Sequence, residues 1–201
     1  LTGAAMVATQ LSNADLRSAV LKQANLERAD LSGADLSAAN LRDTRLQYTN
    51  FSGAKLSDAK LSGADLRGAD LAEAEVLFAD LSGTNLEDVD FSRAFPRGVI
   101  LDGATGLDPK SQLIWNIINQ GGVGEDLSNV DLSEAKLYSV NLSGATLAGA
   151  NLRGTILVGA DLSCADLRGA DLRAASFSSA RLEKADLRMS DCEGAVFSEA
   201  I

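Results

Sequence analysis

The sequence has no histidine, and this absence removes several kinds of active site. Without histidine, neither a Ser-His-Asp nor a Cys-His arrangement can form, and the usual zinc ligands are missing. Only two cysteines occur, and the repeat described below directs Cys164 outward and Cys192 inward, so we expect no bridge between them. We therefore expect no catalytic residue, no metal site, no cofactor and no enzyme activity. No role is assigned to the exposed thiol of Cys164.

Basic residues are also in deficit, with 18 Lys and Arg against 28 Asp and Glu, a net charge of -10. This balance argues against direct binding to nucleic acid phosphates or to an anionic membrane. No apolar run approaches the length that spans a bilayer, and no signal peptide stands at the start. Because the first residue is Leu1, we expect a processed or excised chain. The compartment stays open between the cytoplasm and, if a signal was removed, the thylakoid lumen or periplasm.

Aromatic residues make up only 4% of the chain, and most of the 46% of hydrophobic residues are Leu and Ala. These residues recur with a period of five. From Leu11 to Phe91, and again from Leu127 to Phe197, every fifth residue is apolar, and the residue two places earlier is small in all of these repeats but the one at Leu127. We call these two places the central position and the small position.

A period of five fits neither the 3.6 of an α-helix nor the 2 of a β-strand. Each pentapeptide must therefore turn back to an equivalent direction, and four of them close a square coil of twenty residues. The central residue points into the coil, and the remaining places, rich in Asp, Asn, Ser, Arg and Gly, face water. Stacked coils then pair their backbones at roughly the 4.8 Å spacing of a β-sheet. The sequence predicts an all-β solenoid of about nine coils.

One insertion interrupts the repeat between central residues Leu101 and Leu127. The step of 26 residues exceeds the usual five by 21, so 21 residues are inserted at one corner of a coil. If Leu101 lies on the third side of that coil, Leu127 can take the fourth side. We therefore predict that 127–201 continues the solenoid of 1–101. Within 102–126, "LDPKSQLIWNIINQGG" predicts a short α-helix at about 109–119, with Asp108 as N-cap and Gly121 beyond its end. Its apolar residues form a stripe, and so short a helix needs a surface on which to lie.

Large apolar residues at outward places suggest where that surface is. They gather on one predicted face and form what we call the hydrophobic dock: Leu77, Phe78, Phe95, Tyr138, Ile156 and Val158. We expect the inserted helix to lie on the hydrophobic dock. The alternative is that the same residues form an exposed patch for a partner protein.

The stretches "ANLERADLSGADLSAANL" and "GADLSCADLRGADLRAASF" resemble the pentapeptide-repeat family, and the resemblance covers all but residues 102–126. It implies a right-handed quadrilateral β-helix and no catalytic residues. The segment "SQLIWNIINQGG" resembles interruptions in cyanobacterial members. Some family members inhibit or protect DNA gyrase by imitating the shape and charge of duplex DNA.

Acidic residues on another predicted face are the second candidate surface. We call this set the acidic face, and it comprises Asp30, Asp70, Asp90, Asp131, Asp171 and Asp191, interleaved with Asn50 and Asn151. Carboxylates stacked so closely repel one another, and Arg93, Arg153 and Arg173 should relieve the repulsion. A solvated surface is one explanation, and imitation of a phosphate track is the other.

Two function classes follow. The first is a non-enzymatic, rigid protein-interaction module or spacer, and the alternative is a DNA-mimicking regulator of DNA gyrase or another DNA-binding enzyme. A protein partner is expected in either case. Because no capping segment is visible at either end, self-association through the ends of the solenoid is a further expectation.

Overall fold

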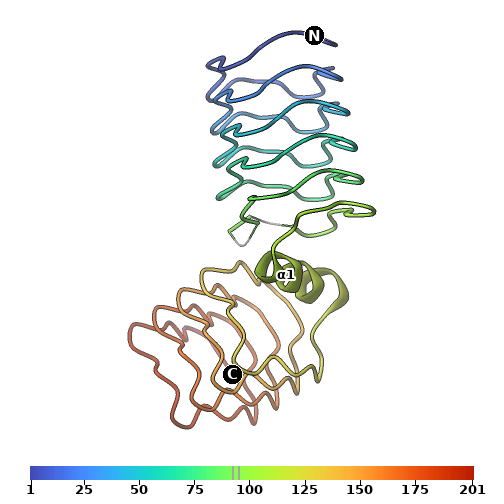
Figure 1. The fold of residues 1–201 in the computed structure, drawn as a ribbon. Helices are drawn as coiled ribbons and strands as arrows, with labels where there is room; N and C mark the ends of the chain where they lie inside the picture. Colours follow the sequence, from blue (N-terminus) through green and yellow to red (C-terminus); the bar gives the residue numbers. More distant parts are fainter. Residues whose placement is uncertain (92, 95) are drawn as a thin grey trace. The chain divides into compact units, whose positions relative to one another are not determined.

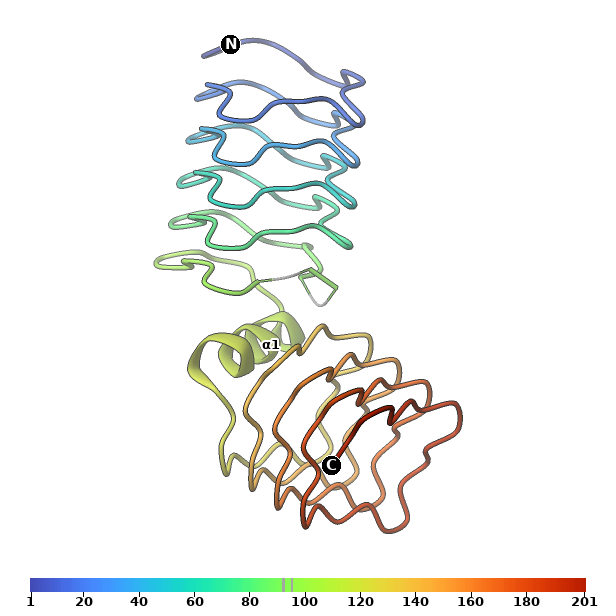
Figure 2. The ribbon, with the colours of Figure 1, turned by 180° about the vertical axis from the view of Figure 1, so that it is seen from behind.

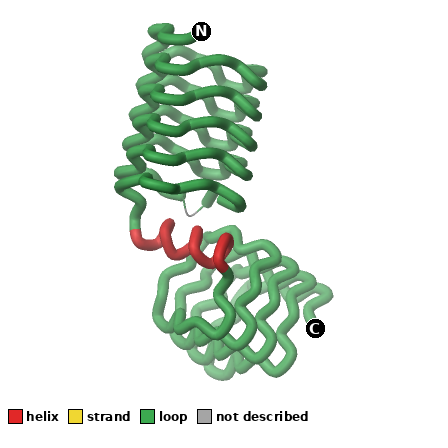
Figure 3. Tube along the Cα trace, turned by 90° about the vertical axis from the view of Figure 1, so that its right-hand side faces the viewer, coloured by secondary structure: helices red, strands yellow, loops and turns green. Residues whose placement is uncertain are grey.

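The computed structural model describes residues 1–91, 93–94 and 96–201, which divide into two compact units. The first unit is Leu1–Ser111 and the second is Gln112–Ile201. Within each unit the backbone runs in successive coils, visible in Figure 1 and from behind in Figure 2. In the described residues, the helix α1 (Pro109–Gln120) is the only regular element, drawn red in Figure 3, and the coils pair through isolated parallel bridges.

Backbone pairing repeats every twenty residues in both units. Parallel bridges join Ala5 to Asn25 in the first unit and Asp126 to Thr146 in the second. Between neighbouring coils the bonds run both ways, as where the Leu21 N–H donates to the Asn40 carbonyl at 2.8 Å. Because twenty residues are four pentapeptides, each coil has four sides, as the period predicts.

Each side ends in a turn that brings the chain around the corner. The Ala24 N–H donates to the Leu21 carbonyl at 3.0 Å, and Gln23, between them, has a φ of 60°. This left-handed conformation costs a residue with a Cβ about 1–2 kcal/mol. The cost explains why glycine is the most frequent residue at this place of the repeat.

The core consists of the central and small positions. Leu26 and Leu152 are central residues without solvent exposure, and Ala24 and Ala150 are equally buried at small positions. Threonine is tolerated there because its hydroxyl finds a carbonyl: Thr155 Oγ1 donates to the Leu132 oxygen at 2.7 Å. A buried hydroxyl without such a partner would cost free energy.

The repeats reach further into the insertion than the sequence predicted. Leu86 N–H donates to the Thr105 carbonyl at 2.7 Å, so the first run ends at Thr105, not at 101. Gly122 N–H donates to the Asn141 carbonyl at 3.1 Å, as Leu127 N–H does to Thr146, so the second run begins at Gly122. Since Gly122 has no central side chain, the search for apolar residues missed this side.

The backbone pairing predicted across the insertion is wrong for two N–H groups, those of Leu86 and Phe91. With an insertion of 21 residues, Leu86 and Phe91 would have paired with the second run. Instead Leu86 pairs with Thr105, and Phe91 N–H donates to Ser111 Oγ at 3.1 Å, both inside the first unit. That the two runs form one solenoid stays a prediction.

The predicted helix is confirmed, including its boundaries. Asp108 Oδ1 accepts the N–H groups of Lys110 and Ser111 at 2.9 and 3.1 Å, as an N-cap does. Pro109 occupies the first helical position, where its missing N–H costs nothing. At the other end Gly121, with a φ of 88°, donates to the Ile117 carbonyl and ends the helix.

The apolar stripe of α1 belongs to the core cluster of the second unit. Ile114 and Ile117 are 0% and 3% exposed and share this cluster with the central residues Leu127, Leu132 and Leu137. Tyr138, a member of the hydrophobic dock in the same unit, is 40% exposed. That the stripe lies on the hydrophobic dock stays a prediction.

Candidate interaction surfaces

The acidic face is assembled within each unit. Bridges stack Asp30, Asn50 and Asp70 in the first unit, and Asp131, Asn151, Asp171 and Asp191 in the second. Asp90 instead lines a cleft described below. The structure thus brings together two acidic columns, one in each unit, and that they share one face stays a prediction.

Asparagine separates the carboxylates in both columns. Asn50 Nδ2 donates to Asp30 Oδ1 at 3.3 Å, and Asn151 Nδ2 donates to Asp131 Oδ1 at 2.9 Å. An amide that donates to one carboxylate replaces a like-charge contact with a charge-assisted hydrogen bond. The asparagines are visible in the sequence, but only the structure shows that their amide groups donate to the neighbouring carboxylates.

Arginine relieves part of the remaining repulsion, as expected, in the second unit. Arg173 Nη2 lies 2.6 Å from Asp171 Oδ2, and its Nε lies 3.7 Å from Asp191 Oδ2. The hydrogen bonds from Arg173 lower the pKa of Asp171 to about 2. Arg93, expected to serve the acidic face, instead pairs with Glu73 at 3.1 Å.

The described members of the hydrophobic dock lie in two groups. In the second unit Tyr138 lies beside Ile156 and Val158 on the neighbouring coil, because Ser139 N–H donates to the Val158 carbonyl at 3.0 Å. In the first unit Leu77 is half-buried and Phe78 is 61% exposed. Phe95 lies outside the described residues.

The ring of Phe78 rests on the turn of the next coil. A Cβ added at Gly98 would clash with the Phe78 ring, so the ring would have to move for any other residue there. Tyr48 lies on Gly68 in the same manner, and the guanidinium of Arg28 stacks 5.4 Å from the Tyr48 ring centre. The rings of Phe78 and Tyr48 therefore each lie over a glycine twenty residues later.

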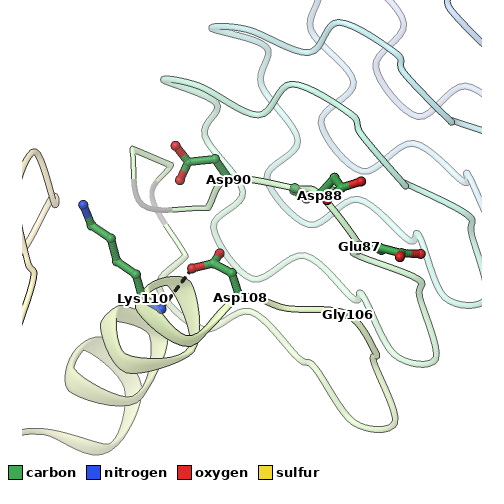
Figure 4. Close-up of a pocket in the computed structure, with 7 residues that line it drawn as sticks. Glu87, Asp88, Asp90, Gly106, Asp108 and Lys110 are labelled. Atoms are coloured by element: carbon green, nitrogen blue, oxygen red, sulfur yellow. Dashed lines mark hydrogen bonds between the residues drawn. The ribbon is translucent and has the colours of Figure 1, made fainter.

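An acidic cleft in the first unit was not predicted from the sequence. Its volume is about 430 Å³, and it is lined by Glu87, Asp88, Val89, Asp90, Gly106, Asp108 and Lys110. Figure 4 shows the carboxylates of Glu87, Asp88 and Asp90 along one coil and Lys110 at the start of α1, whose N–H donates to Asp108. The turn that begins at Gly106 leaves the repeat here, so pentapeptide spacing carried no signal of the cleft.

Neither surface carries the ligands of a metal site. In the described part of the chain, no three Cys, Asp or Glu side chains are grouped so that they could hold an ion. Nor does that part contain a helix of the length and apolar character needed to cross a bilayer. The chemistry that both surfaces offer is that of protein contact: exposed aromatic rings, carboxylates and amides on a regular backbone.

Known proteins share the repeat. The model of the family described as pentapeptide repeats matches eight copies, which together cover residues 1–105, 126–173 and 175–201. No curated protein matches the chain. Among solved structures, HetL, a pentapeptide repeat protein involved in heterocyst differentiation regulation in the cyanobacterium Nostoc sp. strain PCC 7120, is 37% identical. The match covers 100% of this chain and 83% of HetL, with a TM-score of 0.36.

Two further solved structures have lower identity. Rfr23 from the cyanobacterium Cyanothece 51142 is 27% identical over 52% of this chain and 88% of its own, with a TM-score of 0.46. QnrB1, a plasmid-mediated fluoroquinolone resistance protein, is 20% identical over 96% and 89%, with a TM-score of 0.41. The family model alone covers well over half of the chain. The chain therefore belongs to the pentapeptide repeat family, whose fold is a right-handed quadrilateral β-helix, here with one short α-helix.

Proposed function

We propose that this protein is a non-enzymatic, rigid protein-interaction module. The observation that carries the proposal is that one set of positions in the repeat holds the coils together and another set faces outward. Backbone bonds and the central and small positions hold the coils together, as Leu26, Ala24 and the Leu21–Asn40 bond illustrate. The outward side chains vary from side to side while this framework is kept, so they can present a surface to a partner.

We propose the hydrophobic dock and the acidic face as the surfaces that meet a partner. Phe78 supports the first because its ring is held on Gly98 and still exposes 61% of its surface. Rigid aromatic anchors of this kind contribute strongly to protein interfaces. We also propose that the runs 1–105 and 122–201 together make about nine coils, since they contain 21 and 16 central positions at four to a coil.

The DNA-mimicking alternative is not favoured. A phosphate track carries unpaired charges at every step, whereas the acidic columns are interrupted by Asn50 and Asn151, and Asp171 is paired with Arg173. The chain also spreads 18 basic residues among its 28 acidic ones. We expect no inhibition of gyrase supercoiling by the purified protein.

A direct binding comparison tests the module. Partners would be identified by cross-linking mass spectrometry in cyanobacterial extract and then purified, and their Kd measured for the original chain and for Phe78→Ser. We expect at least a tenfold loss of affinity with an unchanged melting temperature. Met189→Ser is the control, because Met189 is 93% exposed and lies outside both surfaces. A reaction catalysed by the pure protein and abolished by one substitution would overturn the proposal.

A further inference from the structure

The first side of the second unit departs from the repeat at its central position and at its small position. Gly122 stands at the central position, and Glu125 stands at the small position. The bonds establish this register: Thr146 N–H donates to the Glu125 carbonyl at 2.9 Å, as Asn151 N–H donates to that of Val130. Every other small position of the two runs holds Ala, Thr, Val or Ser, so Glu125 is the one charged residue at this place.

A pocket lies at this side. Its volume is about 170 Å³, and its walls are Leu113, Asn116, Ile117, Gln120, Gly121, Gly122, Glu125 and Leu127. A side chain at Gly122 is excluded, because a Cβ there would lie 2.7 Å from Leu142 Cδ2. The two departures from the repeat thus have a common result: one leaves no central side chain beside the pocket, and the other adds a carboxylate to its wall.

The pocket is negative at one end and has three apolar side chains in its walls. Helix α1 ends at Gln120, and the last turn of a helix carries about half a negative charge that a basic residue usually offsets. The last turn of α1 contains no basic residue, and none lines the pocket. Glu125 adds a full negative charge, while Leu113, Ile117 and Leu127 supply the apolar walls.

These features select a cation on an alkyl chain. The apolar side chains favour burial of methylene groups, and the oxygen atoms favour a donor of several hydrogen bonds. An ammonium group donates three bonds in diverging directions and matches the side chains of Asn116, Gln120 and Glu125. A guanidinium, in contrast, prefers the two parallel bonds of a carboxylate, and a divalent metal needs more carboxylate ligands than the one available here.

We propose that this pocket receives a lysine side chain of the partner protein. The inference rests on the proposed function as an interaction module and names one point of contact. The aliphatic stem lies against Leu113, Ile117 and Leu127, and the ammonium group meets Glu125 and the carbonyl end of α1. The contact would fix the partner's register on the second unit, because only this side of the coils carries such a pair of departures.

The test uses the full chain and a small probe. Lysine blocked at its α-amino and carboxyl groups would be titrated into ¹⁵N-labelled protein, and the amide shifts of residues 116–127 followed by NMR. We expect saturable shifts that norleucine, blocked in the same way and with the same four side-chain carbons but no ammonium group, does not produce. Glu125→Gln should weaken the probe's binding at least tenfold, and Glu193→Gln, an exposed carboxylate on the last coil, should not.

A second variant keeps the test independent of folding. Gln120→Lys places a cation in the pocket and also suits the end of α1, so the protein should fold while binding of the probe is lost. Equal binding of norleucine, unchanged binding in Glu125→Gln or in Gln120→Lys, tighter binding of blocked arginine, or saturation by Mg²⁺ in place of lysine would each overturn the proposal. If Phe78→Ser loses partner binding but blocked lysine does not bind, the proposed interaction module stands and only the lysine contact is refuted.

Discussion

The backbone N–H of Phe91 donates to Ser111 Oγ at 3.1 Å, where the repeat elsewhere supplies a backbone carbonyl. The Leu31 N–H, for example, donates to the carbonyl of Asn50 nineteen residues later. Ser111 is 1% exposed, so its hydroxyl completes the pairing of the first unit from inside the first turn of α1. Here the Ser111 side chain supplies the acceptor that a backbone carbonyl of the next coil supplies elsewhere.

Removing this hydroxyl should destabilise the first unit. Ser111→Ala leaves the Phe91 N–H buried without an acceptor, which costs about 1–3 kcal/mol. Urea unfolding should show this loss, and amide exchange of Phe91 should accelerate. Ser57→Ala, at an outward place, is the matched control and should stay within about 0.5 kcal/mol of the original chain. Equal stability of the two variants would show that Ser111 Oγ is not the acceptor.

The support of Tyr48 by Gly68 can be separated from backbone strain. Gly68→Ala and Gly53→Ala both place a Cβ at a φ of +65°, with a cost of about 1–2 kcal/mol, but only Gly68 lies under a ring, with Tyr48 Cδ1 2.6 Å from the new atom. We expect Gly68→Ala to cost about 0.5–1.5 kcal/mol more, since Tyr48 must leave its rotamer. Adding Tyr48→Ala should remove this excess in thermal unfolding. An excess that persists without the ring would refute the contact.

Charge stacking on the acidic face should appear when an asparagine becomes aspartate. Asn151→Asp keeps the acceptor that Arg153 N–H uses, but it loses the amide that donates to Asp131 and adds a third carboxylate between Asp131 and Asp171. We expect a loss of about 0.5–1 kcal/mol in low salt that shrinks in 1 M NaCl. Asn151→Ser, without added charge, should show no such salt dependence in chemical unfolding.

Acid should weaken the second unit through two aspartates. Hydrogen bonds from Arg173 and Arg188 lower the pKa values of Asp171 and Asp186 to about 2, below the ordinary 3.8. Depressed carboxyl pKa values stabilise the folded state above about pH 4, and this contribution is lost as the pH falls from about 4 to 2. The melting temperature should drop across this window, and Arg173→Gln with Arg188→Gln should make the drop smaller. An identical pH profile in the double variant would contradict this origin.

The packing of α1 predicts where helix substitutions matter. Ile114→Ala removes a fully buried side chain from the core cluster of the second unit and should cost about 2–5 kcal/mol. Amide exchange in α1 and in residues 122–137 should accelerate together. Gln112→Ala, exposed two residues earlier, should change neither. Loss of protection in α1 alone would mean that the helix does not support the first coil of this unit.

Local pattern alone determined the coil and the helix. The period of five, the small position two before each central residue, and the four sides of a coil all follow from neighbours within a few residues and from the need to bury leucine. The boundaries of α1 followed equally well, because Asp108 and Gly121 act on the turns beside them. Such features depend on chain geometry that is the same in any context.

Tertiary structure decided what depends on which residues meet. Gly122 begins the second run through a backbone bond that no side chain reveals, and Ser111 ends the pairing of the first run from within a helix. The stripe of α1 shares one core cluster with central leucines of the second unit, which the local pattern did not show. In each case several partners were compatible with the local pattern, and the choice was made by the burial of apolar area and the pairing of buried backbone groups, both of which are sums over residues far apart in the chain.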